Sequence, residues 1–212
     1  MNVIVLDTET TNSLEEPIAY DIGWAVVNIE TEEVLKTESY AIAEIFLDKE
    51  LMARAFFADK IPSYWEEIKN GSRKLARIST IRRTLVEDCK AYGVKEIYAF
   101  NVRFDYLSLN LTQRYLTCSK YRYFTPYGSK FMDILKYARH ILKDNAKYRN
   151  FCLENNYLTK NGGNRYTAEV VYRFWFNNDF KEEHKGIDDV KIETQILLKC
   201  LAENHNFNCQ IF

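Results

Sequence analysis

Apolar and polar positions in the first half of the chain predict an antiparallel hairpin beside a buried strand. Residues 3–6 form the aliphatic run Val-Ile-Val-Leu, which is typical of a strand buried on both faces and which ends at polar Asp7. Residues 18–29 and 34–42 predict two further strands around the polar turn Glu-Thr-Glu-Glu. Residues 95–100 predict a fourth, short strand. The first strand is therefore expected to deliver Asp7 to an edge of the sheet.

Helical periodicity dominates the rest of the chain. Apolar residues recur every three or four positions there, and glycine or polar residues mark the segment ends. The predicted helices cover residues 53–70, 74–92, 105–116, 131–142 and 187–201, and the clearest predicted loop covers 157–164. This order of elements indicates an α/β fold, in which helices flank a mixed central sheet that combines the antiparallel hairpin with parallel strands.

The composition predicts a single globular domain over residues 1–212, since 47% of the residues are hydrophobic and 15% are aromatic. A formal net charge of −1 gives no whole-molecule attraction to a polyanion, so any nucleic-acid site must be local. Five scattered cysteines without a C-x-x-C pair indicate reduced thiols, and hence a cytoplasmic location. No apolar run is long enough for a signal sequence or a membrane span, so we expect a soluble protein with no membrane partner.

Asp7 and Glu9 are the first candidate site residues. They lie two apart on an extended segment, so their side chains point the same way. Two converging carboxylates favour a hard divalent cation such as Mg²⁺ or Mn²⁺, and a pair of such ions can stabilise the attacking and the leaving oxygen of a phosphodiester. Ordinary turn chemistry at a strand end explains the same pair without any ligand.

Asp105 is the second candidate, because it follows the predicted strand 95–100 and starts a predicted helix. Ligands of α/β proteins gather at the carboxyl ends of strands. The alternative is that Asp105 caps the helix and that nearby Asn101 closes a turn.

The third candidate segment is His184 to Asp189, at the start of the last predicted helix. Residues five apart on a continuous helix diverge by about 140°, so the histidine and the aspartate reach one site only if Gly186 interrupts the helix. We then expect His184 on the preceding loop, Asp189 in the first helical turn and Asp188 as the cap. A surface histidine of no function is the competing interpretation.

Taken together, these segments resemble the DEDDh branch of the DnaQ-like 3′-to-5′ exonucleases, a family with the ribonuclease H-like fold. The pair Asp7 and Glu9 is similar to the first motif, Asp105 after Phe104 to the second, and His184 with Asp189 five residues on to the third. The stretch Met-Asp-Ile-Leu at 132–135 also resembles a segment that relatives carry between the second and third motifs. The resemblance spans residues 3–201.

The resemblance implies the chemistry of the site. The four acids Asp7, Glu9, Asp105 and Asp189 would hold two Mg²⁺ or Mn²⁺ ions, and His184 would act as general base on the attacking water. Departures from the family pattern are few: the segment 43–70 matches no motif, and the polar Asp21 within the second strand is expected on an exposed or edge side.

The substrate implied is the 3′ end of a single-stranded or frayed nucleic acid, with DNA slightly preferred over RNA. Candidate substrate contacts are Thr8, Thr10 and Asn101, and two basic segments, 69–83 and 120–149, could follow a phosphate backbone. Solvated helix faces explain the same charges. Two alternatives stay open: a catalytically silent nuclease fold that binds nucleic acid or accompanies a polymerase, and an oligoribonuclease-like enzyme on short RNAs. The oligomeric state is not indicated.

Overall fold

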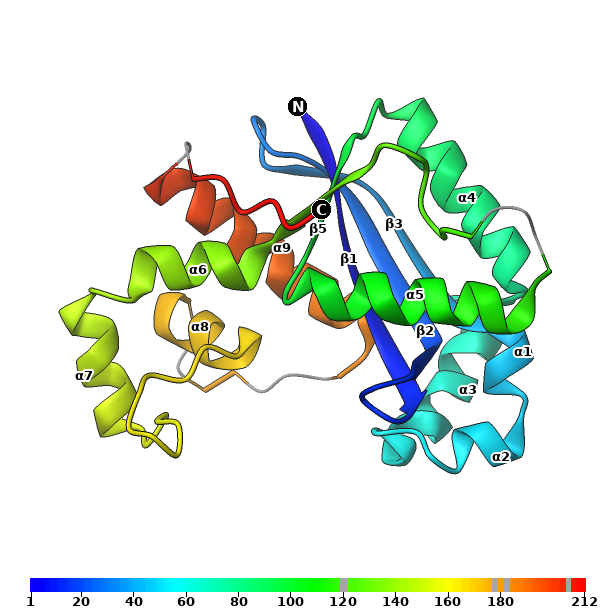
Figure 1. The fold of residues 1–212 in the computed structure, drawn as a ribbon, viewed down its shortest axis with the longest axis horizontal. Coiled ribbons are helices and arrows are strands. Elements are labelled where there is room, and N and C mark those ends of the chain that lie inside the picture. The colour runs from blue at the N-terminus through cyan, green and yellow to red at the C-terminus, as the bar shows by residue number, and fades with distance from the viewer. Residues whose placement is uncertain (119–121, 177–178, 181–183, 205–206) are drawn as a thin grey trace.

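The computed structural model describes the chain except for residues 119–121, 177–178, 181–183 and 205–206. Within the described residues, six strands form one sheet in the order β4-β3-β2-β1-β5-β6 (Figure 1). The pairs β1–β2 and β2–β3 are antiparallel, whereas β1–β5, β5–β6 and β3–β4 are parallel, which confirms the mixed sheet. The strands are β1 (Asn2–Asn12), β2 (Pro17–Asn28), β3 (Glu33–Ile42), β4 (Lys74–Ala76), β5 (Glu96–Ala99) and β6 (Lys130–Asp133).

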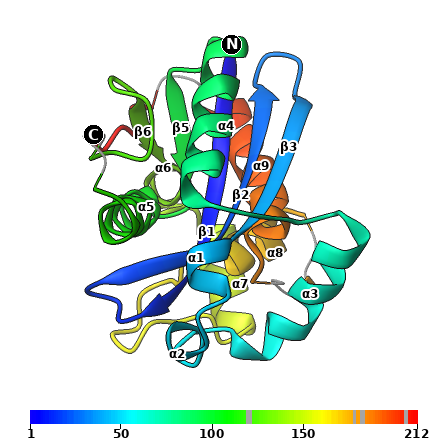
Figure 2. The same ribbon diagram turned by 90° about the vertical axis from the view of Figure 1, so that its right-hand side faces the viewer.

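Helices cover both faces of this sheet, as Figures 1 and 2 show. One apolar layer includes side chains of α1 (Ala43–Phe46), α2 (Lys49–Met52), α3 (Ile61–Asn70), α4 (Ile78–Ala91) and α5 (Val102–Leu116). The other includes those of α6 (Ile134–Leu142), α7 (Ala146–Glu154), α8 (Ala168–Trp175) and α9 (Gly186–Glu203). Alternate residues of β1 belong to opposite layers, because successive side chains of a strand point to opposite faces. The two helical layers thus enclose β1 as a central strand.

Short strands account for two wrong helix predictions. The segment 74–92 begins with β4 and becomes helical only at Ile78, and the segment 131–142 begins within β6 and becomes helical only at Ile134. Three or four residues of strand carry too few positions for periodicity to distinguish them from the start of a helix. The prediction for 53–70 is wrong in its first half, where a 3₁₀ turn at Ala58–Lys60 precedes α3.

Other elements agree with the sequence predictions. The hairpin of β2 and β3, the short β5, the helix α5 and the helix α9 lie where the pattern placed them. The loop 157–164 is confirmed, and it closes with a bridge between Leu158 and Asn164. The helices α7 and α8 lie in a segment for which no helix was predicted. Across the described residues, no helix is both long and apolar enough to cross a membrane.

Candidate active site

The central strand positions the first two acids. Contrary to the expectation of a strand that ends at Leu6, β1 continues to Asn12, and Asp7 and Glu9 lie within it opposite Gly23 and Asp21 of β2. On its other side β1 pairs with β5 only at Ile4 and Val5. That side of β1 is therefore open beyond Val5, and the acids lie where the parallel strand β5 stops. The strand is long because β2 pairs with it through Asn12, with a bulge after Glu9.

Helix α5 supplies the third acid. Its N-cap residue Asn101 adopts a left-handed backbone with φ 68°, a conformation that asparagine tolerates better than most residues, and its N–H donates to Asp133 Oδ1 at 3.1 Å. Asp105 lies one turn further on and is 2% exposed. Its carboxylate accepts a hydrogen bond from the Thr8 hydroxyl at 2.8 Å, and that hydroxyl also lies 3.0 Å from Ser108 Oγ. Asp105 is therefore anchored to β1 and does not cap the helix.

The start of α9 supplies the fourth acid and the histidine. The helix begins at Gly186, as expected, so His184 lies on the preceding segment with φ 54°, and Asp189 lies in the first turn. The N-cap is Lys185, and Asp188 instead accepts from Lys191 at 2.7 Å, so its predicted capping role is wrong. The His184 ring stacks on Phe57, with centroids 4.2 Å apart and an interplanar angle of 7°.

Two glycines let α9 begin directly on the sheet. A Cβ on Gly23 would lie 2.4 Å from the Ile187 nitrogen, and a Cβ on Gly186 would lie 2.9 Å from the Gly23 nitrogen and 3.2 Å from the Asp7 carbonyl oxygen. Any side chain at either position would push the helix away from β1 and β2. The close backbone approach is what brings Asp189 next to the acids of β1.

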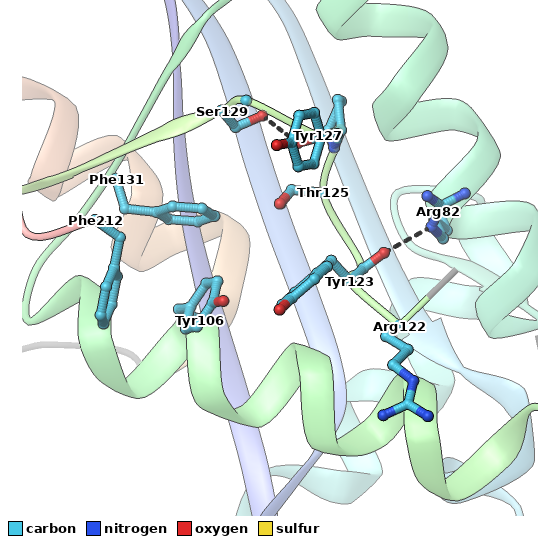
Figure 3. A pocket seen from close by; sticks show the side chains of 11 residues that line it. Arg82, Tyr106, Arg122, Tyr123, Thr125, Tyr127, Ser129, Phe131 and Phe212 are labelled. Carbon is cyan, nitrogen blue, oxygen red and sulfur yellow. Dashed lines mark hydrogen bonds between the residues drawn. The ribbon is translucent and has the colours of Figure 1, made fainter. Parts of the chain in front are cut away.

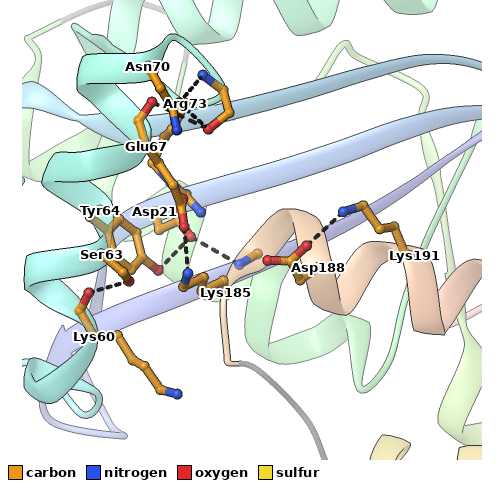
Figure 4. A network of polar contacts seen from close by, with 12 residues as sticks. Asp21, Lys60, Ser63, Tyr64, Glu67, Asn70, Arg73, Lys185, Asp188 and Lys191 are labelled. Carbon is orange, nitrogen blue, oxygen red and sulfur yellow. Dashed lines mark hydrogen bonds and ion pairs between the residues drawn. The ribbon is translucent and has the colours of Figure 1, made fainter.

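A buried polar network fixes the same helix start (Figure 4). Asp21 is fully buried, so the prediction that it lies on an exposed or edge side is wrong. Its carboxylate accepts from the Gly186 N–H at 3.0 Å and from the Tyr64 hydroxyl at 2.8 Å, and it pairs with the Arg73 guanidinium. A sequence cannot show that a charged position of a central strand has a buried partner more than fifty residues away.

The neighbours of Asp21 extend this network to the surface of α3. Arg73, whose side chain is also fully buried, donates to Glu67 at 2.8 Å and lies 4.1 Å above the Tyr64 ring. Lys185 pairs with the same glutamate. The basic segment 69–83 therefore contains a structural arginine, and only part of it faces solvent.

The convergent groups fit a divalent metal site. Ligand atoms of Glu9, His184 and Asp189 all lie within 4.8 Å of one another. Loss of solvent, followed by the negative charges of Glu193, Asp105, Glu9 and Asp189, raises the pKa of Asp7 well above its usual value. Burial raises the pKa of Asp105 to about 7, although the hydrogen bond from Thr8 opposes this shift. Raised pKa values show that the negative charges of these buried carboxylates are not compensated by the protein. A bound Mg²⁺ or Mn²⁺ would compensate them.

Glu193 and Asp133 belong to this site and were not predicted as site residues. Glu193 follows Asp189 by four positions on α9, which places both on one helix face, and it accepts from the Phe100 N–H at 3.1 Å. Asp133 ends β6, caps α6 and accepts from Asn101. The spacing of four was the available signal for Glu193. For Asp133 the available signal was the resemblance of residues 132–135 to a family segment, but no function was assigned to that segment.

An open cleft of about 330 Å³ lies beside the acids. Asp7, Glu193 and Asn101 line it, together with Phe100, Leu135, Tyr166, Thr167 and Ala168. Thr8 and Thr10 are buried at 5% and 3% exposure, and the Thr8 hydroxyl is bonded to Asp105. Of the three predicted substrate contacts, Asn101 is therefore the one that lines the cleft.

Comparisons with known proteins identify the fold. No protein-family model matches the chain, and no curated protein does. Among solved structures, the nuclease domain of 3′hExo, a DEDDh family member bound to rAMP, superposes with a TM-score of 0.63 at 12% identity, over 96% of this chain and 92% of that one. Exonuclease X in complex with 5′ overhanging duplex DNA superposes with a TM-score of 0.53 at 13% identity, over 97% of this chain and 95% of that one. The zinc-bound E. coli ExoI–ssDNA complex superposes with a TM-score of 0.59 at 11% identity, over 97% of this chain and 41% of that one.

These similarities define the class of the fold. The chain shares the fold of these solved exonuclease structures, with the mixed sheet and flanking helices expected from the sequence.

Proposed function

We propose that this protein is a divalent-metal-dependent 3′-to-5′ exonuclease that releases nucleoside monophosphates from nucleic-acid ends. One observation carries the proposal: Glu9, His184 and Asp189, which come from two distant segments, have ligand atoms within 4.8 Å of one another. The raised pKa of Asp7 supports it, because the causes of the shift are burial and then the charges of four acids, which include the other three acids of the predicted set. Fold similarity to DEDDh exonucleases agrees with this chemistry.

The proposed mechanism assigns metal binding to the four acids and proton transfer to the histidine. Asp7, Glu9, Asp105 and Asp189 would hold two Mg²⁺ or Mn²⁺ ions, which would stabilise charge on the attacking and leaving oxygens. His184 accepts the proton of the attacking water, and stacking on Phe57 keeps its ring oriented. Water adds to phosphorus, and the bond from phosphorus to the O3′ of the preceding nucleotide breaks. That oxygen takes up a proton from solvent and becomes the new 3′ hydroxyl, and a nucleoside 5′-monophosphate leaves.

The substrate is the 3′ end of a single or frayed strand, with DNA slightly preferred. Asn101 in the cleft and the backbone at Thr8 and Thr10 would contact the terminal nucleotide. Among similar structures, Exonuclease X forms a complex with 5′ overhanging duplex DNA and a 3′-exonuclease recognises a histone mRNA stem-loop, so both polymers must be tested. The five free cysteines fit a reducing compartment such as the cytoplasm.

Digestion of 5′-labelled single-stranded DNA and RNA in Mg²⁺ or Mn²⁺ tests the proposal. We expect a ladder that shortens from the 3′ end and disappears with EDTA or with Asp7→Ala. The ratio of the DNA and RNA rates then sets the substrate preference. Binding of both polymers without cleavage in either metal would replace the exonuclease with a silent nucleic-acid-binding module.

A further inference from the structure

A second cavity, of about 460 Å³, lies at the β6 edge of the sheet (Figure 3), and it shares no lining residue with the cleft beside the acids. It is bounded by α5, by the segment 122–129 and by β6. Its lining is mainly aromatic and basic, and includes Tyr106, Tyr123, Tyr127, Phe131, Phe212 and Arg122. No described residue of the lining is acidic. Its volume lies within the roughly 300–1,000 Å³ typical of small-ligand sites.

The cavity and the acidic cluster use different sides of α5. Asp105 and Tyr106 are neighbours in sequence, but successive helical residues point about 100° apart. The Asp105 carboxylate bonds to Thr8 on β1, whereas the Tyr106 ring contacts Phe131 with centroids 4.8 Å apart and Phe212 with centroids 4.7 Å apart. These three rings form a fixed aromatic wall.

Two tyrosines of the segment 122–129 face this wall without being part of the core. Tyr127 is fully exposed and Tyr123 is 48% exposed. The segment that carries them is nevertheless anchored: the buried Phe124 donates its N–H to Asn110 at 2.9 Å, and Arg82 of α4 donates to the Tyr123 carbonyl at 3.1 Å. Because these exposed tyrosines contribute little to packing of the core, their aromatic faces are available to a ligand.

We propose that this cavity binds an unpaired nucleobase of a nucleic-acid strand, with the adjoining phosphates near Arg82 and Arg122. Aromatic faces stack on any base, and guanidinium groups attract phosphate, so the combination favours single strands with little sequence preference. The positive charge is local, as it must be in a chain with a net charge of −1. The inference rests on the proposed function, because the cavity would hold the strand while its 3′ end occupies the acidic cluster.

Equilibrium binding tests this site separately from catalysis. Fluorescence anisotropy of a labelled oligothymidylate of about twelve nucleotides is measured with the full chain in EDTA, so that nothing is cut. We expect the double variant Tyr123→Ala/Tyr127→Ala to weaken binding about tenfold or more, as loss of base stacking requires. Arg122→Gln should weaken binding and lower the salt slope by about one. The matched control is Tyr115→Ala, which removes a 61% exposed tyrosine of α5 that does not line the cavity.

Each outcome decides a different question. Equal binding by the double variant and by Tyr115→Ala would overturn the nucleobase site, even if the enzyme degrades DNA. Loss of self-association in the double variant, with strand binding unchanged, would overturn it in favour of contact with a second copy. If the wild-type chain cuts nothing but its strand binding depends on these tyrosines, the cavity proposal stands and the exonuclease proposal fails.

Discussion

The backbone N–H of Gly186 donates a hydrogen bond to the Asp21 carboxylate at 3.0 Å, which joins the start of α9 to β2 across 165 positions of the chain. His184 lies two residues before this contact and Asp189 three residues after it. Because Asp21 also bonds to Tyr64 and Arg73, the orientation of both site residues depends on a buried polar network outside the acidic cluster. Several measurable consequences come from this arrangement.

Removing the buried cation should destabilise the fold. Arg73→Met leaves the fully buried Asp21 without its counterion, and breaking one partner of a buried pair costs about 3–5 kcal/mol of unfolding free energy. Thermal denaturation should show a melting temperature lower by about 10 °C. Lys74→Met is the matched control, because this 57% exposed lysine pairs with Glu38 and should cost less than ~1 kcal/mol. Equal losses in the two variants would contradict a special role for Arg73.

Adding one methyl group at Gly23 should displace α9. In Gly23→Ala the new Cβ would lie 2.4 Å from the Ile187 nitrogen, a backbone atom that can only move with the helix. We expect a loss of activity of about 10²-fold or more, since displacement of a catalytic group by an ångström has this effect. Gly163→Ala is the control, because the new methyl would meet only the Thr159 hydroxyl at 3.3 Å. Full activity of Gly23→Ala would refute the close approach.

Phe57 should act on the reaction through His184. Loss of the stacked ring in Phe57→Ala frees the imidazole, so kcat should fall about tenfold while KM stays the same. In His184→Ala the kcat should fall further, by roughly 10²–10⁴-fold. Phe56→Ala removes the neighbouring, 49% exposed phenylalanine and should leave kcat unchanged. A matching drop in both phenylalanine variants would indicate a general effect on the segment.

Without metal, the acidic cluster should destabilise the fold at neutral pH. The native pKa values of Asp7 and Asp105 are raised, so the native chain binds more protons than the unfolded chain between about pH 4 and 7. Metal-free stability should therefore increase as pH falls through this range. In EDTA near pH 8, Asp7→Asn should raise the melting temperature by about 2–4 °C, and Mg²⁺ should stabilise only the wild type. A lower melting temperature for metal-free Asp7→Asn than for the metal-free wild type would contradict destabilisation by the acidic cluster.

The hydrophobic pattern predicted the hairpin of β2 and β3, because these strands carry enough residues for alternation or an apolar run to be visible. It also predicted the four-residue β5, which Phe100 and Asn101 separate from the helix that follows. It failed at β4 and β6, whose three and four residues merge with the helices that follow. It also ended β1 too early, since Asp7 to Asn12 are polar and their strand conformation is set by pairing with β2. Pairing between distant strands is not visible in a single local pattern.

The candidate site residues of the three motifs could be selected from the sequence because each stands at an element boundary or on alternate strand positions. Asp21 was misplaced for a physical reason: its burial is compensated by Arg73, and no local signal connects residues 52 positions apart. Glu193 was missed although it lies one helical turn after Asp189, because the role of a helix face is clear only when its neighbours are known.

Comparison of Asp189→Asn with Asp188→Asn on a 5′-labelled strand in Mg²⁺ tests the central claim most directly. The two substitutions remove the same charge at adjacent positions of α9. Of the two aspartates, it is Asp189 whose carboxylate oxygen lies within 4.8 Å of the ligand atoms of Glu9 and His184. We expect Asp189→Asn to abolish shortening from the 3′ end and Asp188→Asn to retain the wild-type rate. Equal rates in the two variants would contradict a metal site formed by these residues and, with it, the exonuclease mechanism.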